Sequence, residues 1–393
     1  MDVTITPAPL AGRITPPPSK SQAHRAVLAM MLSQGVGDLR NLSQSQDIEA
    51  TKRCCAALKD PGAPCDGLPM LDCGESGSTL RFLIPVALAL RGGGHFTGQG
   101  RLMDRPQKPY FDIFDEKGIF YDQLYGVLTV KGTLLPGIYR LPGDVSSQFV
   151  TGLLYALPLL DGDSEIVLTS PLESRDYVAM TLDVLERFGV KVENEGYERF
   201  QVPGKQRFTA VDMTIEADWS QAGFWYAAAF LGNAVEVAGM DPNSAQGDRV
   251  VAELYWRLAK PGDVAIDVSG CPDLVPPLAV MAAVRQGEMR IVNAARLRIK
   301  ESDRLSAVTQ VLRALGADIA ELPDGLRIAG QDRLKGGAAV DSFNDHRIAM
   351  MAAVAATVCA APVTVLGAEC VRKSYPGFWD DYKALGGQLE VRE

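Results

Sequence analysis

Cationic side chains stand where several helices are expected to begin, an unusual placement because a helix N-terminus already carries partial positive charge. Lys20, Ser21 and Arg25 follow three prolines at 16–18, which stop a preceding helix. Further cations in similar positions are Arg81, Arg105, Lys300, Arg304, Arg347 and Lys373. A bound anion, most simply phosphate, would neutralise them. The spacing is not that of a Walker loop, and solvated surface cations remain the alternative.

The total charge limits what this anion is. The chain has 39 Lys and Arg against 48 Asp and Glu, a formal net charge of −9. A general nucleic-acid or membrane-surface role would require a basic face, so we expect neither partner. A local cationic pocket remains compatible with this total. It would suit a small ligand or ligand pair carrying two phosphates and two carboxylates.

Length predicts two or three domains, and the apolar runs and first residues predict a cytoplasmic location. The 393 residues are too many for one compact core. The longest apolar runs, such as residues 348–361, are shorter than the roughly 20 residues that span a bilayer. The first residues lack the basic and apolar regions of a secretory signal.

Cysteine and histidine usage argues against a metal site. The chain has seven cysteines without a C-x-x-C motif, and three histidines. We expect reduced cysteines that serve in packing, Cys65 among them, with the adjacent Cys54 and Cys55 on a helix. No metal and no cofactor is predicted.

An internal repeat organises the chain, with a period of about 65 residues. Each copy contains a segment with apolar residues at i, i+3, i+4 and i+7, typical of an amphipathic helix on a sheet, followed by a short β-like run. These segments are 47–60, 110–122, 177–193, 248–268, 302–319 and 375–391. Strands are predicted at residues 165–169 and 289–292, and an N-terminal strand at 2–6.

A second helix type, apolar on nearly all sides, lies between these segments and is therefore expected to be buried. Its copies are 21–34, 76–90, 147–160, 220–231, 272–284 and 345–358. Each begins with small or polar residues typical of N-caps. Buried helices whose polar N-termini converge would form an anion site. The alternative is that they are only core helices with ordinary caps.

Nine short motifs give the chain a specific resemblance. They are PSKSQAHR at 18–25, GESGSTLR at 74–81, DRP at 104–106, VSSQ at 145–148, SRDY at 174–177, PD at 272–273, LRIKESDRL at 297–305, NDHRIAM at 344–350 and RKSYP at 372–376. In this order they resemble the 3-phosphoshikimate 1-carboxyvinyltransferases of the enolpyruvyl transferase family. KESDRL and NDHR are fairly specific, and the nine together span nearly the whole chain.

The resemblance implies an α/β fold of two inside-out α/β barrel domains. Each would hold three sheet-and-helix repeats around buried parallel helices, with a two-stranded crossover. We expect residues 14–216 to form one domain, mainly on the shikimate 3-phosphate side. Residues 1–13 with 217–393 would form the other, carrying catalysis and much of the phosphoenolpyruvate side. The resemblance also implies domain closure on the ligands.

The resemblance assigns substrates and binding residues. The enolpyruvyl group of phosphoenolpyruvate would pass to the 5-hydroxyl of shikimate 3-phosphate through a tetrahedral ketal, with release of phosphate, on the route to chorismate and aromatic amino acids. Shikimate 3-phosphate would contact Lys20, Ser21, Arg25, Ser146, Ser147, Gln148, Ser174, Asp273 and Lys300. Phosphoenolpyruvate would contact Lys20, Gly77, Arg105, Gln148, Arg304, Arg347 and Lys373. A monomer is expected.

Three residues are the implied proton-transfer groups. A carboxylate beside a lysine provides two groups whose pKa values the environment can drive apart. Asp273 is favoured as the base for the hydroxyl, with Lys300 close to the same oxygen. Glu301 is the candidate for moving the methyl proton, and an ion pair with a nearby arginine is its alternative role.

Some positions depart from the family pattern. Glu75 replaces a common Asn, which puts phosphoenolpyruvate affinity in question, and Asp176 replaces a common Pro. Trp219 is bulkier than the usual residue at the crossover. Arg296 replaces an Asn that binds phosphoshikimate in some members, so that contact is not carried over.

Two other functions remain as alternatives. The related transferase that uses UDP-N-acetylglucosamine as acceptor has the same architecture, but its first motif is G-x-K-N rather than P-S-K-S. A non-catalytic anion-binding relative is the second alternative, and the presence of Asp273, Lys300 and Glu301 argues against it.

Overall fold

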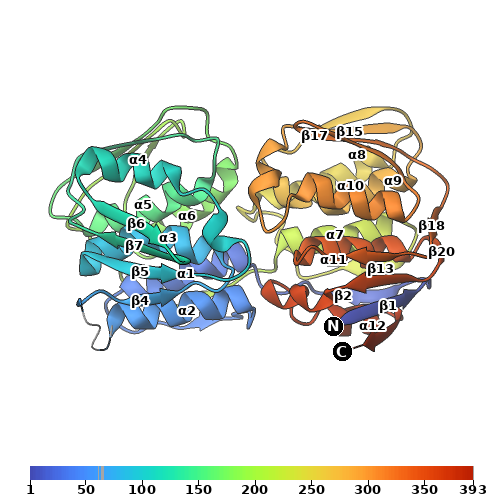
Figure 1. Cartoon of the computed structure of the whole chain (residues 1–393), viewed down its shortest axis with the longest axis horizontal. Coiled ribbons are helices and arrows are strands. Elements are labelled where there is room, and N and C mark those ends of the chain that lie inside the picture. The colour runs from blue at the N-terminus through green and yellow to red at the C-terminus, as the bar shows by residue number, and fades with distance from the viewer. Residues whose placement is uncertain (61, 63–65, 393) are drawn as a thin grey trace. The chain divides into compact units, whose positions relative to one another are not determined.

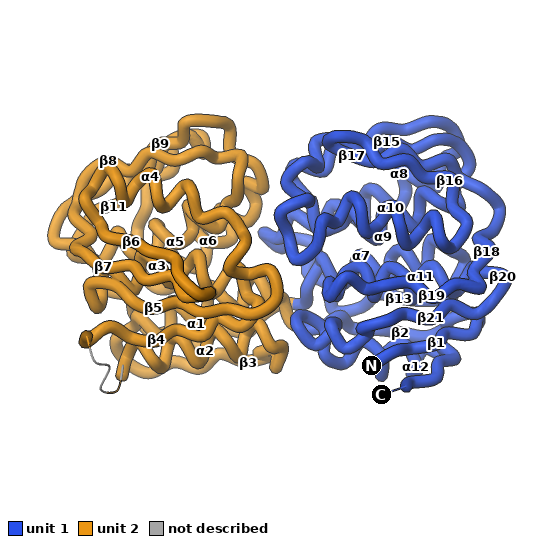
Figure 2. Tube along the Cα trace, in the orientation of Figure 1, with its two compact units in different colours: residues 1–17, 217–393 blue, residues 18–216 orange. Residues whose placement is uncertain are grey.

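The computed structural model describes residues 1–60, 62 and 66–392 of a mixed α/β chain (Figure 1). The chain divides into two compact units, coloured separately in Figure 2. Unit 1 comprises residues 1–17 and 217–393, and unit 2 comprises residues 18–216. The first crossing therefore lies after Pro17 rather than after Arg13. The reason is that strand β2 (Ala11–Ile14) pairs with β13 (Ala234–Val237) of unit 1.

One repeat in unit 2 shows the folding pattern. Its elements are β4 (Met70–Asp72), α3 (Gly77–Arg91), β5 (Gly93–Thr97), α4 (Lys108–Lys117), β6 (Phe120–Leu124) and β7 (Val127–Lys131). The sheet order is β4-β5-β7-β6, with β4 parallel to β5 and the other pairs antiparallel. A parallel pair needs a crossover connection, and the buried helix α3 provides it.

The same order recurs once more in unit 2. This copy has β8 (Ile138–Leu141), α5 (Ser147–Ala156), β9 (Ser164–Leu168), α6 (Arg175–Arg187), β10 (Glu193–Glu195) and β11 (Arg199–Val202). The remaining elements of unit 2 include α1 (Lys20–Leu32), β3 (Leu39–Arg40), α2 (Gln46–Lys59) and β12 (Met213–Thr214), with β3 parallel to β12. Unit 2 thus holds two four-stranded sheets and one two-stranded sheet in its described part.

Unit 1 repeats this arrangement. One copy is β14 (Val264–Asp267), α9 (Val275–Val284), β15 (Glu288–Val292), α10 (Arg304–Ala314), β16 (Asp318–Leu322) and β17 (Gly325–Ala329). The last copy is β19 (Ala339–Asp341), α11 (His346–Ala356), β21 (Val363–Leu366), α12 (Phe378–Ala384) and β22 (Gln388–Arg392). Its fourth strand is β1 (Asp2–Thr6), which lies between β21 and β22. Other elements are α7 (Trp219–Phe230), α8 (Val251–Leu258), β18 (Leu334–Gly336) and β20 (Cys359–Ala361).

The predicted contrast between buried and amphipathic helices is confirmed. Every residue of α11 is buried, and so are residues 275–283 of α9. Helices α7, α9 and α11 pack on one another in the core of unit 1. In contrast, α6 and α10 each bury only one face. The buried face of α10 packs on β16 as well as on helices, whereas that of α6 packs on α1 and α5. The predicted strands at residues 2–6, 165–169 and 289–292 match β1, β9 and β15.

The two chain crossings place helix caps. In unit 2, the amide of Ser19 donates to the carbonyl of Glu216 at 2.7 Å, and Ser19 caps α1 through its side chain. In unit 1, the amide of Asp218 donates to the carbonyl of Pro17 at 2.9 Å, and Asp218 caps α7. The crossings therefore position the first turns of two buried helices.

Several cysteines that the structure describes are unoxidised and buried, Cys54 and Cys55 on α2 among them. Cys65 lies outside the described residues. Within the described residues, no helix is both long and apolar enough to cross a membrane.

Candidate active site

A buried arginine organises the polar cluster of unit 1. Arg304 is the first residue of α10, where the carboxylate of Asp303 caps the helix, and its side chain is 1% exposed. Its Nη1 donates to Asp273 Oδ1 at 2.8 Å and its Nη2 donates to Glu301 Oε2 at 2.7 Å. Its Nε donates to Asp345 Oδ2 at 2.8 Å. One guanidinium thus holds three carboxylates, and they keep the pKa of Arg304 above its usual range despite burial.

Asp273 is shared by two arginines. It lies in the short 3-10 turn Pro272–Leu274 that leads into α9. Its Oδ2 accepts from Nη2 of Arg347 at 2.9 Å, while Oδ1 is bound by Arg304. Burial by itself would raise the pKa of Asp273, but the charges of Arg347, Lys300 and Arg304 outweigh it and hold that pKa well below its usual range. Asp273 is therefore ionised at neutral pH.

Lys300 titrates much closer to neutral pH than an ordinary lysine. Burial is the largest cause, and the nearby charge of Arg304 adds to it, while Asp273 and Glu301 act in the opposite direction. The pKa of Lys300 falls to about 8 as a result. The ionised carboxylate of Asp273 and a lysine with a pKa of about 8 thus lie in one cluster, and their roles in proton transfer stay a prediction.

Asp345 is a member of this cluster that the sequence did not predict. It is fully buried and caps α11, with Oδ1 accepting from the amide of Arg347 at 3.0 Å. Its other oxygen accepts from Ser302 Oγ at 3.0 Å as well as from Arg304. Asp345 thereby links the start of α10 to the start of α11. The NDHR motif contained this residue, but an acidic N-cap is ordinary in sequence and gave no sign of a buried ion pair.

Two further cations of unit 1 have defined contacts. Arg347 donates through Nη2 to Ser220 Oγ at 3.0 Å, and through Nη1 to the carbonyl of Asp273 at 3.3 Å. Lys373, in the 3-10 segment Ala368–Lys373, donates to the carbonyl of Asn344 at 2.6 Å. Both side chains are buried, and protein contacts hold both cations in place.

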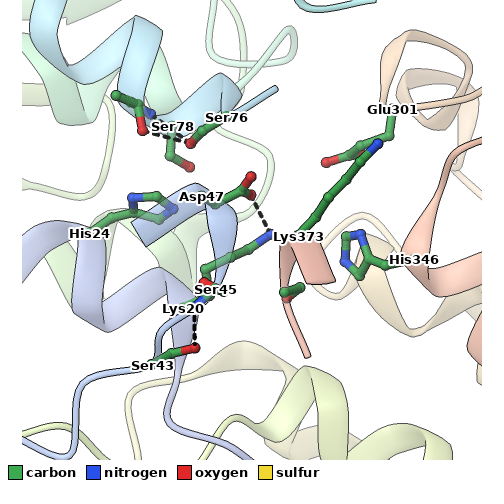
Figure 3. Close-up of polar contacts among 12 residues, drawn as sticks. Lys20, His24, Ser43, Ser45, Asp47, Ser76, Ser78, Glu301, His346 and Lys373 are labelled. Carbon is green, nitrogen blue, oxygen red and sulfur yellow. Dashed lines mark hydrogen bonds and ion pairs between the residues drawn. The ribbon is translucent and has the colours of Figure 1, made fainter. Parts of the chain in front are cut away.

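In unit 2, the start of α1 carries an ion pair. Lys20 is the first residue of α1, and its Nζ lies 2.8 Å from Asp47 Oδ2 at the start of α2 (Figure 3). Ser21 follows it, and its carbonyl accepts from Arg25 Nη1 at 2.7 Å. The pairing orients the Lys20 ammonium. Asp47 was not among the predicted site residues.

Arg25 points into the core of unit 2. Its Nε donates to Thr181 Oγ1 at 2.8 Å, and its Nη2 donates to the carbonyl of Tyr177 at 2.9 Å. Its guanidinium lies over the Phe82 ring at 5.2 Å. Burial lowers the pKa of Arg25 to about 10. These contacts tie α1 to α6, and contact of Arg25 with a phosphate stays a prediction.

The start of α3 brings Gly77 against an arginine. A Cβ added at Gly77 would lie 2.5 Å from Arg105 Nη1 and 3.5 Å from Gln148 Oε1, so the guanidinium passes directly over this residue. Gln148 accepts from Arg81 Nη1 at 2.9 Å and donates to Ser78 Oγ at 3.0 Å. Three predicted phosphoenolpyruvate residues of unit 2 therefore lie together. Arg81, noted in the sequence only as a cation, holds the amide of Gln148.

The predicted serines lie at the starts of two other helices. Ser146 caps α5, accepting from the amide of Gln148 at 3.3 Å, and Ser147 begins that helix. Ser174 precedes α6 with a left-handed backbone at φ +54, uncommon for serine. The structure thus places each at a helix N-terminus, where amide groups favour anions.

The structure shows the contacts of three residues that depart from the family pattern, Glu75, Trp219 and Arg296. A Cβ at Gly100 would lie 2.5 Å from Glu75 Oε2, so this carboxylate packs against the loop leading to Arg105. Trp219 begins α7 and donates through its indole nitrogen to the carbonyl of Asp241 at 3.1 Å. Arg296 donates to the carbonyl of Ser269.

Each unit therefore combines cations at helix starts with well-ordered polar partners, and unit 1 adds an ionised carboxylate beside a lysine of lowered pKa. Such sites suit the transfer of a group between anionic small molecules. Similarity to known proteins shows which class of transferase this is.

A family model for EPSP synthase (3-phosphoshikimate 1-carboxyvinyltransferase) matches residues 5–382. A 3-phosphoshikimate 1-carboxyvinyltransferase of Clostridium kluyveri is 46% identical, over 99% of this chain and 98% of that protein. That of Clostridium acetobutylicum is 44% identical over 98% of each chain. The solved EPSP synthase of Acinetobacter baumannii has the same fold, with a TM-score of 0.79 at 23% identity and full coverage of both chains.

The family model and the relatives make this chain a transferase of the enolpyruvyl type, and the solved structure shows that it has the same fold. It belongs to the EPSP synthase family, the 3-phosphoshikimate 1-carboxyvinyltransferases. The expected two-domain α/β fold is confirmed. Neither alternative from the sequence, a UDP-N-acetylglucosamine acceptor or a non-catalytic relative, is favoured by these relatives.

Proposed function

We propose that this chain transfers the enolpyruvyl group of phosphoenolpyruvate to the 5-hydroxyl of shikimate 3-phosphate, and that the residues described above carry the steps. The family and the Clostridium relatives support the reaction. The observation that carries the assignment of roles is the Arg304 cluster, because it places Asp273, Glu301 and Asp345 around one cation.

Phosphoenolpyruvate is bound by Lys20, Gly77, Arg105, Gln148, Arg304, Arg347 and Lys373. Arginine forks suit its carboxylate and phosphate, since both offer paired oxygens. The Cβ-free Gly77 leaves Arg105 room beside the backbone. Shikimate 3-phosphate is bound by Lys20, Ser21, Arg25, Ser146, Ser147, Gln148, Ser174, Asp273 and Lys300.

The chemistry proceeds in two stages. In the first, Asp273 accepts the proton of the 5-hydroxyl while that oxygen bonds to C2 of phosphoenolpyruvate, and Glu301, which enters this step protonated, donates its proton to C3 to form the methyl group. In the second, Glu301 removes a methyl proton as the bond between C2 and the phosphate oxygen breaks, and the departing phosphate takes up the proton held by Asp273. The products are the enolpyruvyl ether and inorganic phosphate, and both carboxyl groups return to their starting protonation states.

The arginines explain how Asp273 becomes a stronger base when it is needed. Its pKa is held low by Arg347 and Arg304. Anionic groups of phosphoenolpyruvate that bind those arginines offset their charge. The pKa of Asp273 then rises toward its ordinary value at the moment the hydroxyl arrives.

Release of phosphate from phosphoenolpyruvate tests the function. We expect release that depends on shikimate 3-phosphate and does not occur with UDP-N-acetylglucosamine. Release with the nucleotide sugar, or with neither acceptor, would overturn the proposal. Asp273→Asn is the matched variant, and should lower kcat by about 10²- to 10⁴-fold. A monomeric state and a cytoplasmic location stay predictions. Sedimentation velocity would test the monomeric state.

A further inference from the structure

A chain of buried side-chain hydrogen bonds joins three helices of unit 2. It begins at His24 on α1, whose Nδ1 lies 2.7 Å from Thr51 Oγ1 on α2. Thr51 Oγ1 in turn lies 2.7 Å from Thr79 Oγ1 on α3. Thr79 Oγ1 donates to Ser76 Oγ at 2.7 Å, and Ser76 is the cap of α3.

None of these groups contacts bulk water to any extent, since each residue is at most 2% exposed. Burying an imidazole and three hydroxyls is costly unless they satisfy one another, and apolar residues of similar shape would avoid that cost. We infer that these hydrogen bonds fix the three helices relative to one another.

Each bond in the chain has a preferred direction. Burial, together with the charges of Lys20 and Arg25, keeps the pKa of His24 well below its usual value, so the ring is neutral and carries one proton. His24 Nε2 has no hydrogen-bond partner among the described residues. A buried N–H without an acceptor is rarer than an unused lone pair, which puts the proton on Nδ1, donating to Thr51. Thr79 donates its single hydroxyl proton to Ser76, so Thr51 is the donor in the bond between Thr51 and Thr79.

Both ends of the chain reach residues assigned to substrate. At one end, Ser76 Oγ also accepts from the amide of Thr79 at 3.2 Å, which fixes the turn that contains Gly77. Nearer its start, the carbonyl of Asp47 lies 3.2 Å from Thr51 Oγ1, as a second and longer acceptor for the hydroxyl proton that Thr51 directs toward Thr79. The carboxylate of Asp47 holds Lys20 (Figure 3).

We propose that His24, Thr51 and Thr79 are positioning residues for enolpyruvyl transfer, which hold Gly77 and Lys20 in the geometry that binds phosphoenolpyruvate. They touch no reacting atom and act through the first turn of α3 and through Asp47. The inference rests on the proposed function, because that function places Gly77 and Lys20 against this substrate.

Matched substitutions at Thr79 separate the hydrogen bond from packing. Thr79→Val keeps the shape and removes the hydroxyl, whereas Thr79→Ser keeps the hydroxyl. We expect Thr79→Val to raise the KM for phosphoenolpyruvate about 3- to 10-fold, with the KM for shikimate 3-phosphate within about twofold. Thr79→Ser should stay close to the parent enzyme. Equal KM values for phosphoenolpyruvate in the two variants would overturn the proposal.

His24 offers a second pair with rescue. His24→Leu removes the donor, and His24→Asn restores an amide N–H at the same distance along the side chain as Nδ1. His24→Leu should raise the KM for phosphoenolpyruvate and His24→Asn should restore most of it. A thermal unfolding midpoint for every variant ensures that assays use folded protein. If both His24 variants are equally impaired while folded, the proposed direction of the chain is wrong and the proposal fails.

A double variant and a comparator complete the test. Thr51→Val and Thr79→Val each remove the hydrogen bond between Thr51 and Thr79. The effect of the double variant on the KM for phosphoenolpyruvate should therefore be less than the product of the two single effects. An effect equal to that product would count against coupling through this hydrogen bond. Gly77→Ala is the comparator for the site itself. If it leaves the KM for phosphoenolpyruvate unchanged, the proposed substrate site fails and the positioning proposal fails with it. If only Gly77→Ala has an effect, the positioning proposal alone is overturned.

Discussion

Arg304 donates through Nη1 to Oδ1 of Asp273 at 2.8 Å, and this ion pair joins the first turn of one helix to the turn that leads into another. The arginine is almost fully buried, whereas Asp273 retains an exposed fraction of 16%. The charge that holds the carboxylate is thus shielded from water. The Asp273 side chain, by contrast, keeps part of its surface accessible.

Loss of the Arg304 charge should destabilise unit 1. Arg304→Met leaves Asp273, Glu301 and Asp345 without their shared cation, so we expect the free energy of unfolding to fall by about 3–5 kcal/mol. Urea unfolding measures this. Arg290→Met is the control, because Arg290 pairs with Glu288 at the surface and its loss should change little. A variant at Arg304 as stable as the parent would show that the cluster adds no net stability.

A methyl group at Gly77 should act on one substrate. In Gly77→Ala, the new Cβ would lie 2.5 Å from Arg105 Nη1, so the guanidinium must move. We expect the KM for phosphoenolpyruvate to rise about tenfold or more, and the KM for shikimate 3-phosphate to change little. Gly377→Ala is the control, since its Cβ would approach only Asp381 Oδ2, at 4.0 Å. An equal rise in both KM values would contradict a specific clash.

The activity should depend on the charge of Lys300. We propose that its ammonium form stabilises negative charge on the attacking oxygen. Because its pKa is about 8, this form is lost as the pH rises through that value. We expect kcat/KM for the free enzyme to decline above pH about 8. Lys300→Arg should move this decline beyond the measured range at the cost of a lower maximum. A flat profile to pH 10 in the parent enzyme would be inconsistent with the role.

The same group should oppose folding at neutral pH. Because the folded pKa of about 8 lies below the ordinary 10.5, the unfolded chain binds more protons between these values. The contribution of Lys300 to stability therefore rises from pH 8 to 10.5 and is least favourable below 8. Lys300→Met should raise the free energy of unfolding at pH 7 by about 1 kcal/mol while abolishing transfer. Calorimetry of both proteins at pH 7 and 10 measures the difference, which should shrink at the higher pH.

The role of Glu301 in proton transfer should be separable from the binding of both substrates. Glu301→Gln keeps an oxygen for Arg304 Nη2, now 2.7 Å from Glu301 Oε2, but removes the proton-accepting carboxylate. We expect kcat to fall about 10²- to 10⁴-fold with both KM values nearly constant. Exchange of solvent deuterium into the methylene of phosphoenolpyruvate, followed by NMR, should fall in parallel. Normal exchange in this variant would show that Glu301 does not move the methyl proton and serves only in its ion pair with Arg304.

Helix positions could be predicted from the sequence because their signals are local. The Ala- and Leu-rich run of α11 and the one-sided pattern of α10 each report burial within a few turns. The polar residues at helix starts likewise appear within a few positions, as Ser19 and Asp218 do. The sequence of motifs further identified the family and its substrates.

The partners of those residues depended on the tertiary structure. Arg304 lies 31 residues from Asp273 and 41 from Asp345, so no local pattern could pair them. Arg25 reads in sequence as a phosphate ligand, yet its donors reach Thr181 and Tyr177, 156 and 152 residues away. His24 looked like part of a motif and no more. Its hydroxyl partners come from other helices, and burial, which decides its charge, exists only once those helices pack.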